Sequence, residues 1–241
     1  MKDTIKIENK KHTLMVAHRG ASGIERENTL PAFIEAGKRS YFGEECDIHY
    51  TKDGKFVIYH DDTTERLCNE KHFIEETDFA TLRALKIKGT DSEEFADLHM
   101  PTFEEYLSVI KKDGKVGVVE LKLRMSEKAI AYAVELCKKY YSLDKIIFIS
   151  FFFDNLVDLR KILPKQPVQF LTCADWDDRL IERLASHKFD LDIGYWLLTK
   201  ERVEALHKRG ILVNCWTCDK KEDAEQLIDW GVDFITTNTL E

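Results

Sequence analysis

The sequence predicts a (β/α)8, or TIM, barrel with a small insertion after the second barrel strand. Eight short apolar runs are rich in strand-forming residues, helical patterns separate most of them, and charged residues stand where several runs end. The chain has 241 residues and is 44% hydrophobic, which is enough for one large α/β core. We therefore expect residues 1–241 to form one barrel domain that includes the insertion, at about residues 61–101. An open, doubly wound sheet would show a similar alternation and is left as the alternative.

The strands and helices alternate along the chain. Strands are expected at residues 14–17, 44–50, 116–123, 145–150, 168–172, 191–194, 211–217 and 233–237. Helices are expected at about residues 29–40, 102–112, 126–141, 154–163, 177–187, 199–209 and 220–230. Thr102 and Glu105 fit a capping box at the start of one helix. Ser126 and Thr199 suit N-cap positions, and Gly231 suits a helix end.

One segment breaks this alternation after the second strand. Residues 50–60 are typical of a β-hairpin, because Asp53-Gly54 suits a two-residue type I′ turn between extended runs. Residues 61–101 are then polar, poor in helical pattern, and acidic at residues 91–97. We expect this insertion to be a lid or specificity element, or else a packed excursion that plugs the barrel mouth, and the sequence does not decide between them.

The composition restricts the expected partners. The net charge of −8 and the pI of about 5.6 argue against binding to nucleic acid or anionic lipid, but they allow a small phosphorylated ligand in a local positive pocket. Residues 1–13 carry neither a signal nor an anchor pattern, so we expect a cytoplasmic protein without integral membrane association. The six cysteines lack zinc-site spacing, and residues 215–218, although of C-x-x-C form, lie in an expected strand. Reduced, buried thiols are therefore the favoured interpretation.

Alternation along the expected strand 44–50 places Glu45 and Asp47 on one face and Cys46 on the other. Counting back from a two-residue turn at constant register puts His60 opposite Asp47. Because directly paired residues share a face, the hairpin is expected to deliver His60 to the two carboxylates, unless a bulge changes the register.

Glu120 and Lys122 share a face of the expected strand 116–123. Charged side chains at the end of a barrel strand are costly unless they are paired, metal-bound or functional. The carboxylates of Glu45, Asp47 and Glu120 are hard oxygen ligands, which suit Mg²⁺ or Ca²⁺ and not zinc. We therefore expect one divalent cation and leave open which of the two it is.

His18 and Arg19 follow the first expected strand, at the end where barrel active sites are built. An imidazole can accept or supply a proton near neutral pH, so His18 and His60 together permit paired acid and base roles. Arg19 and Lys122 can bind phosphate oxygens. These groups predict metal-assisted cleavage of a phosphodiester.

Nine short segments place these residues in a recognisable order. They are His18-Arg19-Gly20, Glu27-Asn28-Thr29, Glu45-Cys46-Asp47, Thr51-Lys52-Asp53-Gly54, His60-Asp61, Pro101-Thr102, Glu120-Leu121-Lys122, Ser150-Phe151 and Trp216-Thr217. The series resembles the motifs of the glycerophosphodiester phosphodiesterase family over about residues 14–237. The resemblance implies a phospholipase-C-like phosphodiesterase barrel and a divalent cation. It also implies hydrolysis of glycerophosphodiesters, such as glycerophosphocholine or glycerophosphoethanolamine, to glycerol 3-phosphate and an alcohol.

The resemblance also implies a role for each matching residue. These are the catalytic His18 and His60, the metal ligands Glu45, Asp47 and Glu120, the phosphate-binding Arg19 and Lys122, the apolar wall of Phe151 and Trp216, and the supporting Glu27, Asn28 and Thr29. The chain departs from the family pattern at Cys46, where an aliphatic residue is more usual, and at Cys218-Asp219. Cys46 faces away from the site, so we expect it to change packing only.

Two other functions remain open at this stage. The same site could act on a lysophospholipid or a phosphoinositide-like diester, for which we would expect an exposed apolar rim beside the insertion. A non-catalytic protein that binds glycerophosphate would need the pocket but not two proton-transfer groups. The preferred head group, the order in which the histidines act, and the oligomeric state are not determined by the sequence.

Overall fold

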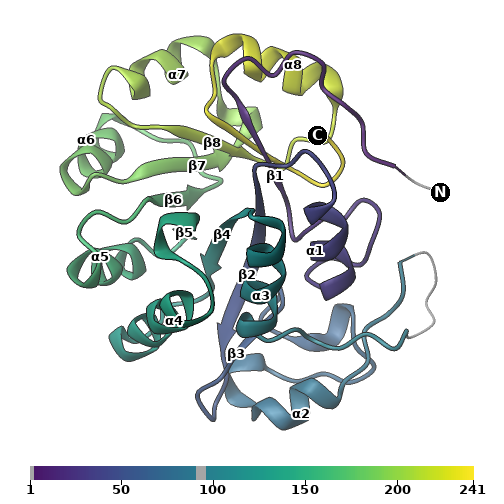
Figure 1. Cartoon of the computed structure of the whole chain (residues 1–241). Helices are drawn as coiled ribbons and strands as arrows, with labels where there is room; N and C mark the ends of the chain where they lie inside the picture. The colour runs from purple at the N-terminus through teal and green to yellow at the C-terminus, as the bar shows by residue number, and fades with distance from the viewer. Residues whose placement is uncertain (1–2, 91–95) are drawn as a thin grey trace.

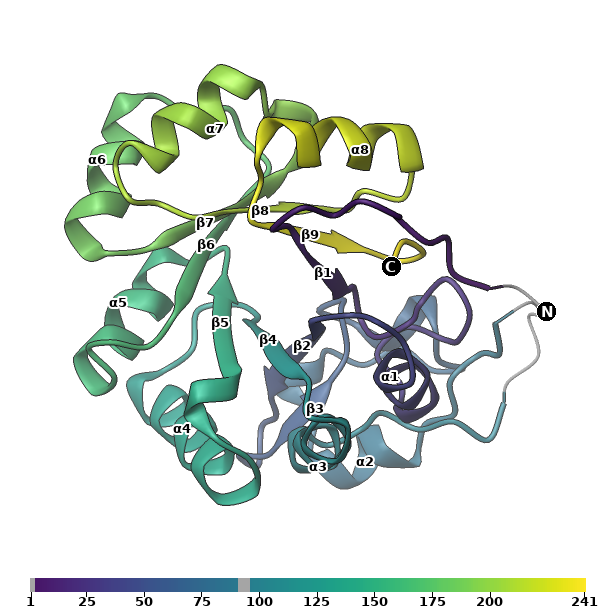
Figure 2. The ribbon, with the colours of Figure 1, turned by 45° about the horizontal axis from the view of Figure 1, so that its top comes forward.

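Strand β1 (Leu14–Ala17) pairs in parallel with both β2 (Gly43–Tyr50) and β9 (Phe234–Thr237), and these two pairings close the sheet into a barrel. The remaining barrel strands are β4 (Val116–Leu121), β5 (Ile146–Ser150), β6 (Val168–Thr172), β7 (Asp190–Gly194) and β8 (Val213–Trp216). The computed structural model describes residues 3–90 and 96–241, and its strands lie at the centre of the molecule with the helices outside (Figures 1 and 2). The predicted TIM barrel is confirmed, and the open sheet is wrong because this sheet has no free edge between β1 and β2.

The helices begin and end close to the predicted positions. They are α1 (Leu30–Gly37), α3 (Phe103–Asp113), α4 (Glu127–Tyr140), α5 (Phe153–Ile162), α6 (Asp178–His187), α7 (Lys200–His207) and α8 (Lys221–Trp230). The insertion adds the short α2 (Phe79–Ala84), which was not predicted. Short 3-10 helices are η1 (Thr64–Arg66), η2 (Ile74–Glu76), η3 (Leu143–Lys145) and η4 (Tyr195–Leu197). The capping box of Thr102 and Glu105 is present, and the side chains of Ser126 and Thr199 accept backbone N–H groups. Gly231 ends α8 in the left-handed conformation.

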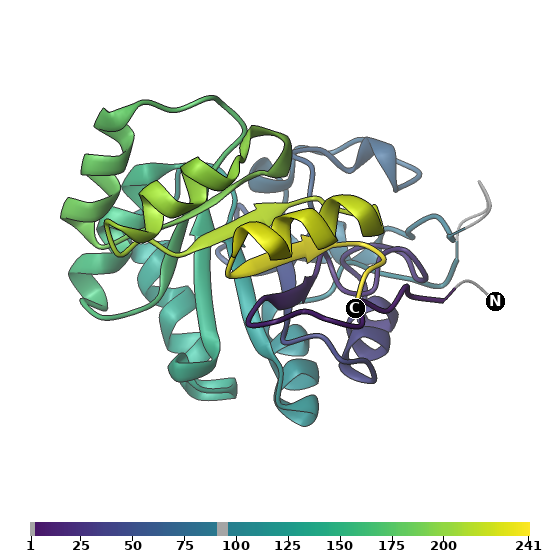
Figure 3. The same ribbon diagram turned by 90° about the horizontal axis from the view of Figure 1, so that it is seen from above.

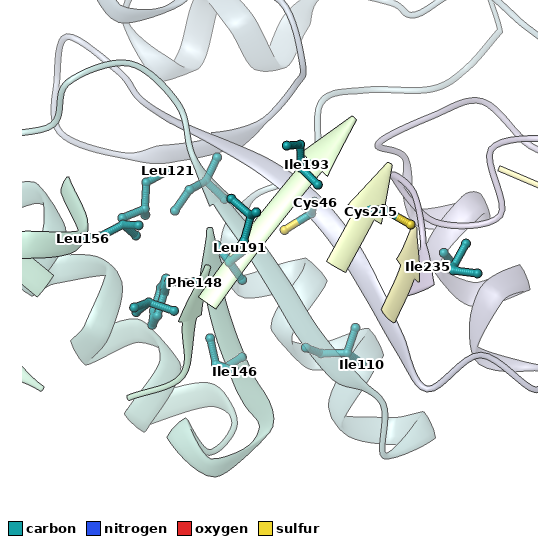
Figure 4. Close-up of a cluster of buried hydrophobic side chains, with 14 of the residues drawn as sticks. Cys46, Ile110, Leu121, Ile146, Phe148, Leu156, Leu191, Ile193, Cys215 and Ile235 are labelled. Atoms are coloured by element: carbon teal, nitrogen blue, oxygen red, sulfur yellow. The ribbon is translucent and has the colours of Figure 1, made fainter. Parts of the chain in front are cut away.

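Two hydrophobic layers hold the barrel together. The outer layer lies between strands and helices, where Cys46 of β2 is fully buried, so its predicted outward orientation is confirmed. Figure 4 shows this layer with Ile110 of α3 and Leu156 of α5 among its members. The inner layer fills the barrel below the site and includes Val118 and Phe234. Glu45 and Asp47 are therefore held at the end of an already packed interior.

The hairpin after β2 has a longer turn than the predicted one. The N–H of Thr51 donates to the carbonyl of Lys55 at 2.8 Å, which leaves three residues, 52–54, in the loop. Gly54 has φ +80°, the left-handed conformation that closes a three-residue hairpin loop with a bulge. The predicted two-residue turn is wrong, because Asp-Gly is compatible with either loop length.

This extra loop residue shifts the register of β3 (Phe56–Ile58) by one position. Ile48 pairs with Ile58, and the N–H of Tyr59 donates to the carbonyl of Asp47 at 3.1 Å. Asp47 thus lies opposite Tyr59 and not opposite His60. His60 still reaches the site, because regular pairing ends at Ile58 and the chain bends at residue 60.

The described part of the insertion packs around a hydrophobic core of its own beside β3. This core contains Val57, Tyr59, Leu67, Cys68, Ile74, Leu82, Leu85, Ile87 and Met100. Arg83 of α2 forms an ion pair with Glu105 of α3 at 2.7 Å, which joins the insertion to the barrel helices (Figure 1). These contacts favour a packed excursion over a mobile lid. Most of the predicted acidic stretch, residues 91–95, lies outside the described residues.

The beginning and end of the described chain run side by side (Figure 3). The N–H of Ile5 donates to the carbonyl of Thr239 at 2.8 Å, and that of Ile7 donates to Glu241 at 2.7 Å. These bonds hold the segment that follows β9, which carries Asn238. In the described ranges, no helix combines the length and the apolar character needed to cross a membrane.

Candidate active site

A pocket lies at the carboxyl ends of the barrel strands, where TIM barrels carry their active sites. Among its lining residues are seven of the predicted ones: His18, Arg19, Glu45, His60, Glu120, Phe151 and Trp216. The lining also includes residues that were not predicted, namely Ile149, Leu171, Asp192 and Thr236. Side chains from distant parts of the sequence therefore meet in one place.

Glu45, Asp47 and Glu120 form a buried cluster in which one oxygen of each lies within 4.8 Å of the others. Burial and the charge of Asp47 raise the pKa of Glu45 well above its usual value and raise the pKa of Glu120 to about 8. In addition, Oδ1 of Asp47 is buried and accepts no hydrogen bond. A cation between three buried carboxylates of this kind would stabilise them, and oxygen donors fit Mg²⁺ or Ca²⁺.

Two cationic side chains flank the carboxylates. Nζ of Lys122 lies 2.9 Å from Glu120 and 3.4 Å from Oδ1 of Asp47, and Nε of Arg19 lies 3.5 Å from Oδ2 of Asp47. Although burial alone would raise the pKa of Asp47, Lys122 and Arg19 hold it below its usual value. Arg19 lines the pocket, so its guanidinium is placed to meet an anionic ligand.

The backbone at Arg19 and Gly20 turns sharply to bring these groups together. Both residues have positive φ, +57° and +75°, and the N–H of Arg19 donates to Oε2 of Glu45 at 2.8 Å. A Cβ atom on Gly20 would lie 2.6 Å from the carbonyl carbon of Ala32, so the position requires glycine. The left-handed Arg19 is the kind of strained residue that is common at functional sites.

The supporting residues act at different distances from the pocket. Asn28 donates from Nδ2 to Oδ2 of Asp47 at 2.7 Å, and Glu27 accepts from Arg19 at 2.8 Å. Thr29 donates only to the carbonyl of Arg26, at 2.6 Å. Glu27 and Asn28 therefore orient site side chains directly, whereas Thr29 holds the turn that carries them.

His18 has a neutral hydrogen-bond partner that the sequence did not predict. Its Nδ1 lies 2.8 Å from Oδ1 of Asn238, and Nδ2 of Asn238 donates to Asp219 at 2.6 Å. Since Asn238 presents an acceptor, Nδ1 of His18 carries the hydrogen and Nε2 keeps its lone pair. Burial, with the nearby charge of Arg19, lowers the pKa of His18 to about 4.

His60 has a charged partner instead. Its Nδ1 lies 2.6 Å from Oδ1 of Asp61. Arg66, from η1 in the insertion, donates to both oxygens of Asp61, at 2.6 and 3.1 Å, and to both oxygens of Glu27, at 3.0 and 2.7 Å. Burial lowers the pKa of His60, and the charge of Asp47 opposes this shift. Arg66 was not predicted, because nothing in a polar insertion distinguishes one arginine from its neighbours before the contacts are known.

Aromatic side chains form the upper wall of the pocket. The rings of Phe151 and Trp216 pack edge to face with centroids 5.7 Å apart, and Trp196 packs on Trp216 at 5.9 Å. Phe151 is 39% exposed and Trp196 is 58% exposed. This wall lies where the resemblance placed it, and Trp196 extends it outward.

Comparison with known protein families shows to which family the chain belongs. The family model described as "Glycerophosphoryl diester phosphodiesterase family" matches residues 18–241. The chain belongs to this family. The predicted family and enzyme class are thereby confirmed.

The relatives of this family member extend over nearly its whole length. A glycerophosphodiester phosphodiesterase of Caldanaerobacter subterraneus subsp. tengcongensis is 32% identical over 235 residues, which cover 95% of each protein. A glycerophosphodiester phosphodiesterase of Bacillus subtilis is 29% identical over 244 residues, covering 93% of this chain and 83% of that protein. Among solved structures, an Oleispira antarctica phosphodiesterase in complex with the product sn-glycerol-3-phosphate has a TM-score of 0.87 at 28% identity. It matches 93% of this chain and 92% of its own.

Proposed function

We propose that the protein hydrolyses glycerophosphodiesters to glycerol 3-phosphate and an alcohol with the help of one divalent cation, Mg²⁺ or Ca²⁺. One observation carries the proposal: two imidazoles from separate segments line the same pocket as Glu45 and Glu120, which belong to the buried cluster of three carboxylates. The family supports it, as does the product named for the Oleispira antarctica structure. We also propose that residues 1–241 act as one catalytic domain with its insertion.

Glu45, Asp47 and Glu120 would hold the cation, because their oxygens are the hard donors that Mg²⁺ and Ca²⁺ prefer. When bound, the cation would neutralise charge on the phosphoryl group and help to orient it. Arg19 and Lys122 would contact the remaining phosphate oxygens, Arg19 through its planar fork and Lys122 as a point charge.

His18 is assigned as the first general base. Its Nδ1–H donates to Oδ1 of Asn238, which leaves Nε2 free to accept a proton. Burial lowers the pKa of His18 to about 4, so the imidazole is neutral at neutral pH. In the first step the glycerol 2-hydroxyl loses its proton to His18, and its oxygen attacks phosphorus.

His60 is assigned as the first general acid. Burial lowers its pKa, but the carboxylate of Asp61 opposes this shift by stabilising the imidazolium, whereas the partner of His18 is neutral. As the bond from phosphorus to the alcohol oxygen breaks, His60 gives its proton to that oxygen, and a cyclic phosphate remains. In the second step water attacks phosphorus and gives a proton to His60, while His18 returns its proton to the glycerol 2-oxygen. Both histidines are then restored, and the net change is the addition of one water.

Activity measurements distinguish this function from the two alternatives, a lysophospholipid phosphodiesterase and a non-catalytic binding protein. An exposed aromatic rim of Phe151, Phe152 and Trp196 is the feature that a lysophospholipid would contact, but it follows β5 and β7 and is not beside the insertion. Faster turnover of lysophospholipid micelles than of soluble glycerophosphodiesters would favour the lipid substrate. Tight binding of glycerol 3-phosphate without turnover of any diester would favour a binding protein.

The deciding experiment removes metal with a chelator, restores Mg²⁺ or Ca²⁺ singly, and follows glycerol 3-phosphate release from diesters with different head groups. We expect release to stop without metal and to return with at least one of the two cations. No release from any diester with either cation would contradict the proposed function.

A further inference from the structure

Asp192 is a buried carboxyl group in the pocket for which the proposed mechanism has no use. It is 1% exposed, lies on β7 and lines the pocket. Its Oδ2 accepts a hydrogen bond from Asn214 at 3.1 Å, whereas its Oδ1 has no partner. A buried polar atom without a partner is costly, so Oδ1 of Asp192 calls for an explanation.

Neighbouring side chains fix the orientation of this carboxyl group. Nδ2 of Asn214 donates to Gln169 at 2.9 Å as well as to Asp192, and Thr236 donates to Oδ1 of Asn214 at 3.2 Å. Asp192 takes part in no ion pair among the described residues. Burial, with the charge of Glu120, raises its pKa well above the usual value, which favours the carboxylic acid, a form that can both donate and accept.

The position of β7 places Asp192 across the barrel from the carboxylate cluster. In the closed sheet, β7 is four strands away from β2 in either direction, so Asp192 faces the side that carries Glu45 and Asp47. Below the pocket the barrel is filled by buried side chains such as Val118 and Phe234. A ligand held at the cluster can extend toward Asp192 by only a short distance before it meets this packed floor.

We propose that Asp192 binds the terminal hydroxyl group of the substrate's glycerol unit and so selects diesters whose glycerol is not acylated. This inference rests on the proposed function and assigns a specificity-determining residue to it. The glycerol is the short, constant part of the substrates, so it fits the closed side of the pocket and leaves the variable head group on the open side. Trp216 lines the same pocket and has a buried, unpartnered Nε1–H, which offers a second polar contact.

The energetic argument predicts strong discrimination. A substrate without the terminal hydroxyl leaves Oδ1 of Asp192 buried and without a partner, and such a loss is expected to reduce kcat/KM by about 10- to 100-fold. An acyl chain on that oxygen removes the donor and adds bulk where the floor is packed. Lysophospholipids should therefore be at least as poor substrates as the deoxy analogue.

The test compares glycerophosphoethanolamine with its analogue in which the terminal carbon carries hydrogen in place of hydroxyl. The wild type should prefer the parent compound by about 10- to 100-fold in kcat/KM. Asp192→Leu should lose this preference to within about twofold, and Asp192→Asn, which keeps a donor and an acceptor, should retain most of it. Asp190→Asn is the matched control on the same strand, because Asp190 binds the N–H of Leu212 and does not line the pocket.

An unchanged preference in Asp192→Leu, or a wild type that turns over lysophospholipid at least as well as glycerophosphoethanolamine, would overturn the proposal. Calorimetric titration with glycerol 3-phosphate and its deoxy analogue gives the same comparison without turnover. If the wild type hydrolyses no diester, the proposed function fails, and the ratio of the two binding constants still decides the role of Asp192.

Discussion

Nδ1 of His18 lies 2.8 Å from the side-chain oxygen of Asn238, which is held in place by Asp219. Ser22 donates to the same oxygen at 2.7 Å. The contacts with Ser22 and Asp219 therefore both place the amide oxygen of Asn238, and not its nitrogen, toward His18. His60, by contrast, has the carboxylate of Asp61 as its partner. The two imidazoles therefore differ in the charge of their partners, and the proposed assignment of the first base and the first acid rests on this difference.

Replacing Asn238 by aspartate should change the pH dependence of the reaction. His18 must be neutral to act as a base, so activity falls as the pH drops through its pKa, which burial lowers to about 4. An anionic partner favours the imidazolium, so Asn238→Asp should move the acid limb of the kcat/KM profile upward by about 1–2 pH units. Ser22→Ala is the control, because it removes a neighbour of Asn238 without adding charge. An acid limb at the same pH in Asn238→Asp would contradict the assignment of His18.

Replacing either histidine by alanine should remove catalysis without removing the cation. Acid or base catalysis contributes about 10²- to 10⁴-fold, so His18→Ala and His60→Ala should each lose at least that factor in kcat. Metal content, measured by elemental analysis after dialysis, should stay at the wild-type level because the proposed ligands are carboxylates. His72→Ala, in the insertion and outside the pocket lining, is expected to leave activity unchanged. Near-full activity in either site variant would rule out its catalytic role.

Binding of the cation should stabilise the folded protein. Glu45, Asp47 and Glu120 are buried close together, so Mg²⁺ or Ca²⁺ at about 100 times its Kd should add about 2.7 kcal/mol to the free energy of unfolding. Because the pKa of Glu120 is raised to about 8, protons compete with the cation, and affinity should rise between pH 6 and pH 8.

Thermal unfolding with and without chelator measures this stabilisation. Glu120→Gln should reduce the shift in Tm, whereas Glu135→Gln, on the exposed side of α4, should not. A Tm that does not respond to either cation at any pH in this range would argue against a metal site.

Arg66 should affect the rate through His60 and not through substrate binding. It donates to both oxygens of Asp61 and of Glu27, so Arg66→Ala frees the carboxylate that orients His60 and should lower kcat by about tenfold. Glu27 still accepts from Arg19 in this variant, so KM should change little. Arg66→Lys should recover only part of the loss, because lysine lacks the planar fork.

Arg83→Ala is the matched control for Arg66. Arg83 also belongs to the insertion and pairs with a glutamate, but it contacts α3 and not the site. Equal losses of kcat in Arg66→Ala and Arg83→Ala would show that the insertion contributes only general stability.

Much of the barrel could be predicted because its strands are buried on both sides and read as apolar runs. The charged residues stood out against this background, and Glu45, Asp47 and Glu120 do lie together. The hairpin register could not be predicted, because Gly54 serves a two-residue or a three-residue loop equally well.

The missed residues depend on contacts between distant segments. Asn238 contacts His18, and Asp219 holds Asn238, only when β8 and β9 are packed beside β1, and polar residues near strand ends are too common to single them out. Asp192 left a clearer signal, as an acid between the apolar Leu191 and Ile193 in a buried strand. Such an acid needs either a partner or a function.

The insertion has a hydrophobic core that shares no residue with the two layers of the barrel, and yet it carries Arg66. Segments with separate cores can open as independent cooperative units while the rest of a protein stays folded. A transient opening of this unit would release Asp61 and leave the barrel intact. Catalytic activity would then be lost on warming before the barrel unfolds. Stabilising the insertion core would therefore raise the temperature up to which the enzyme is active, without a change to any pocket residue.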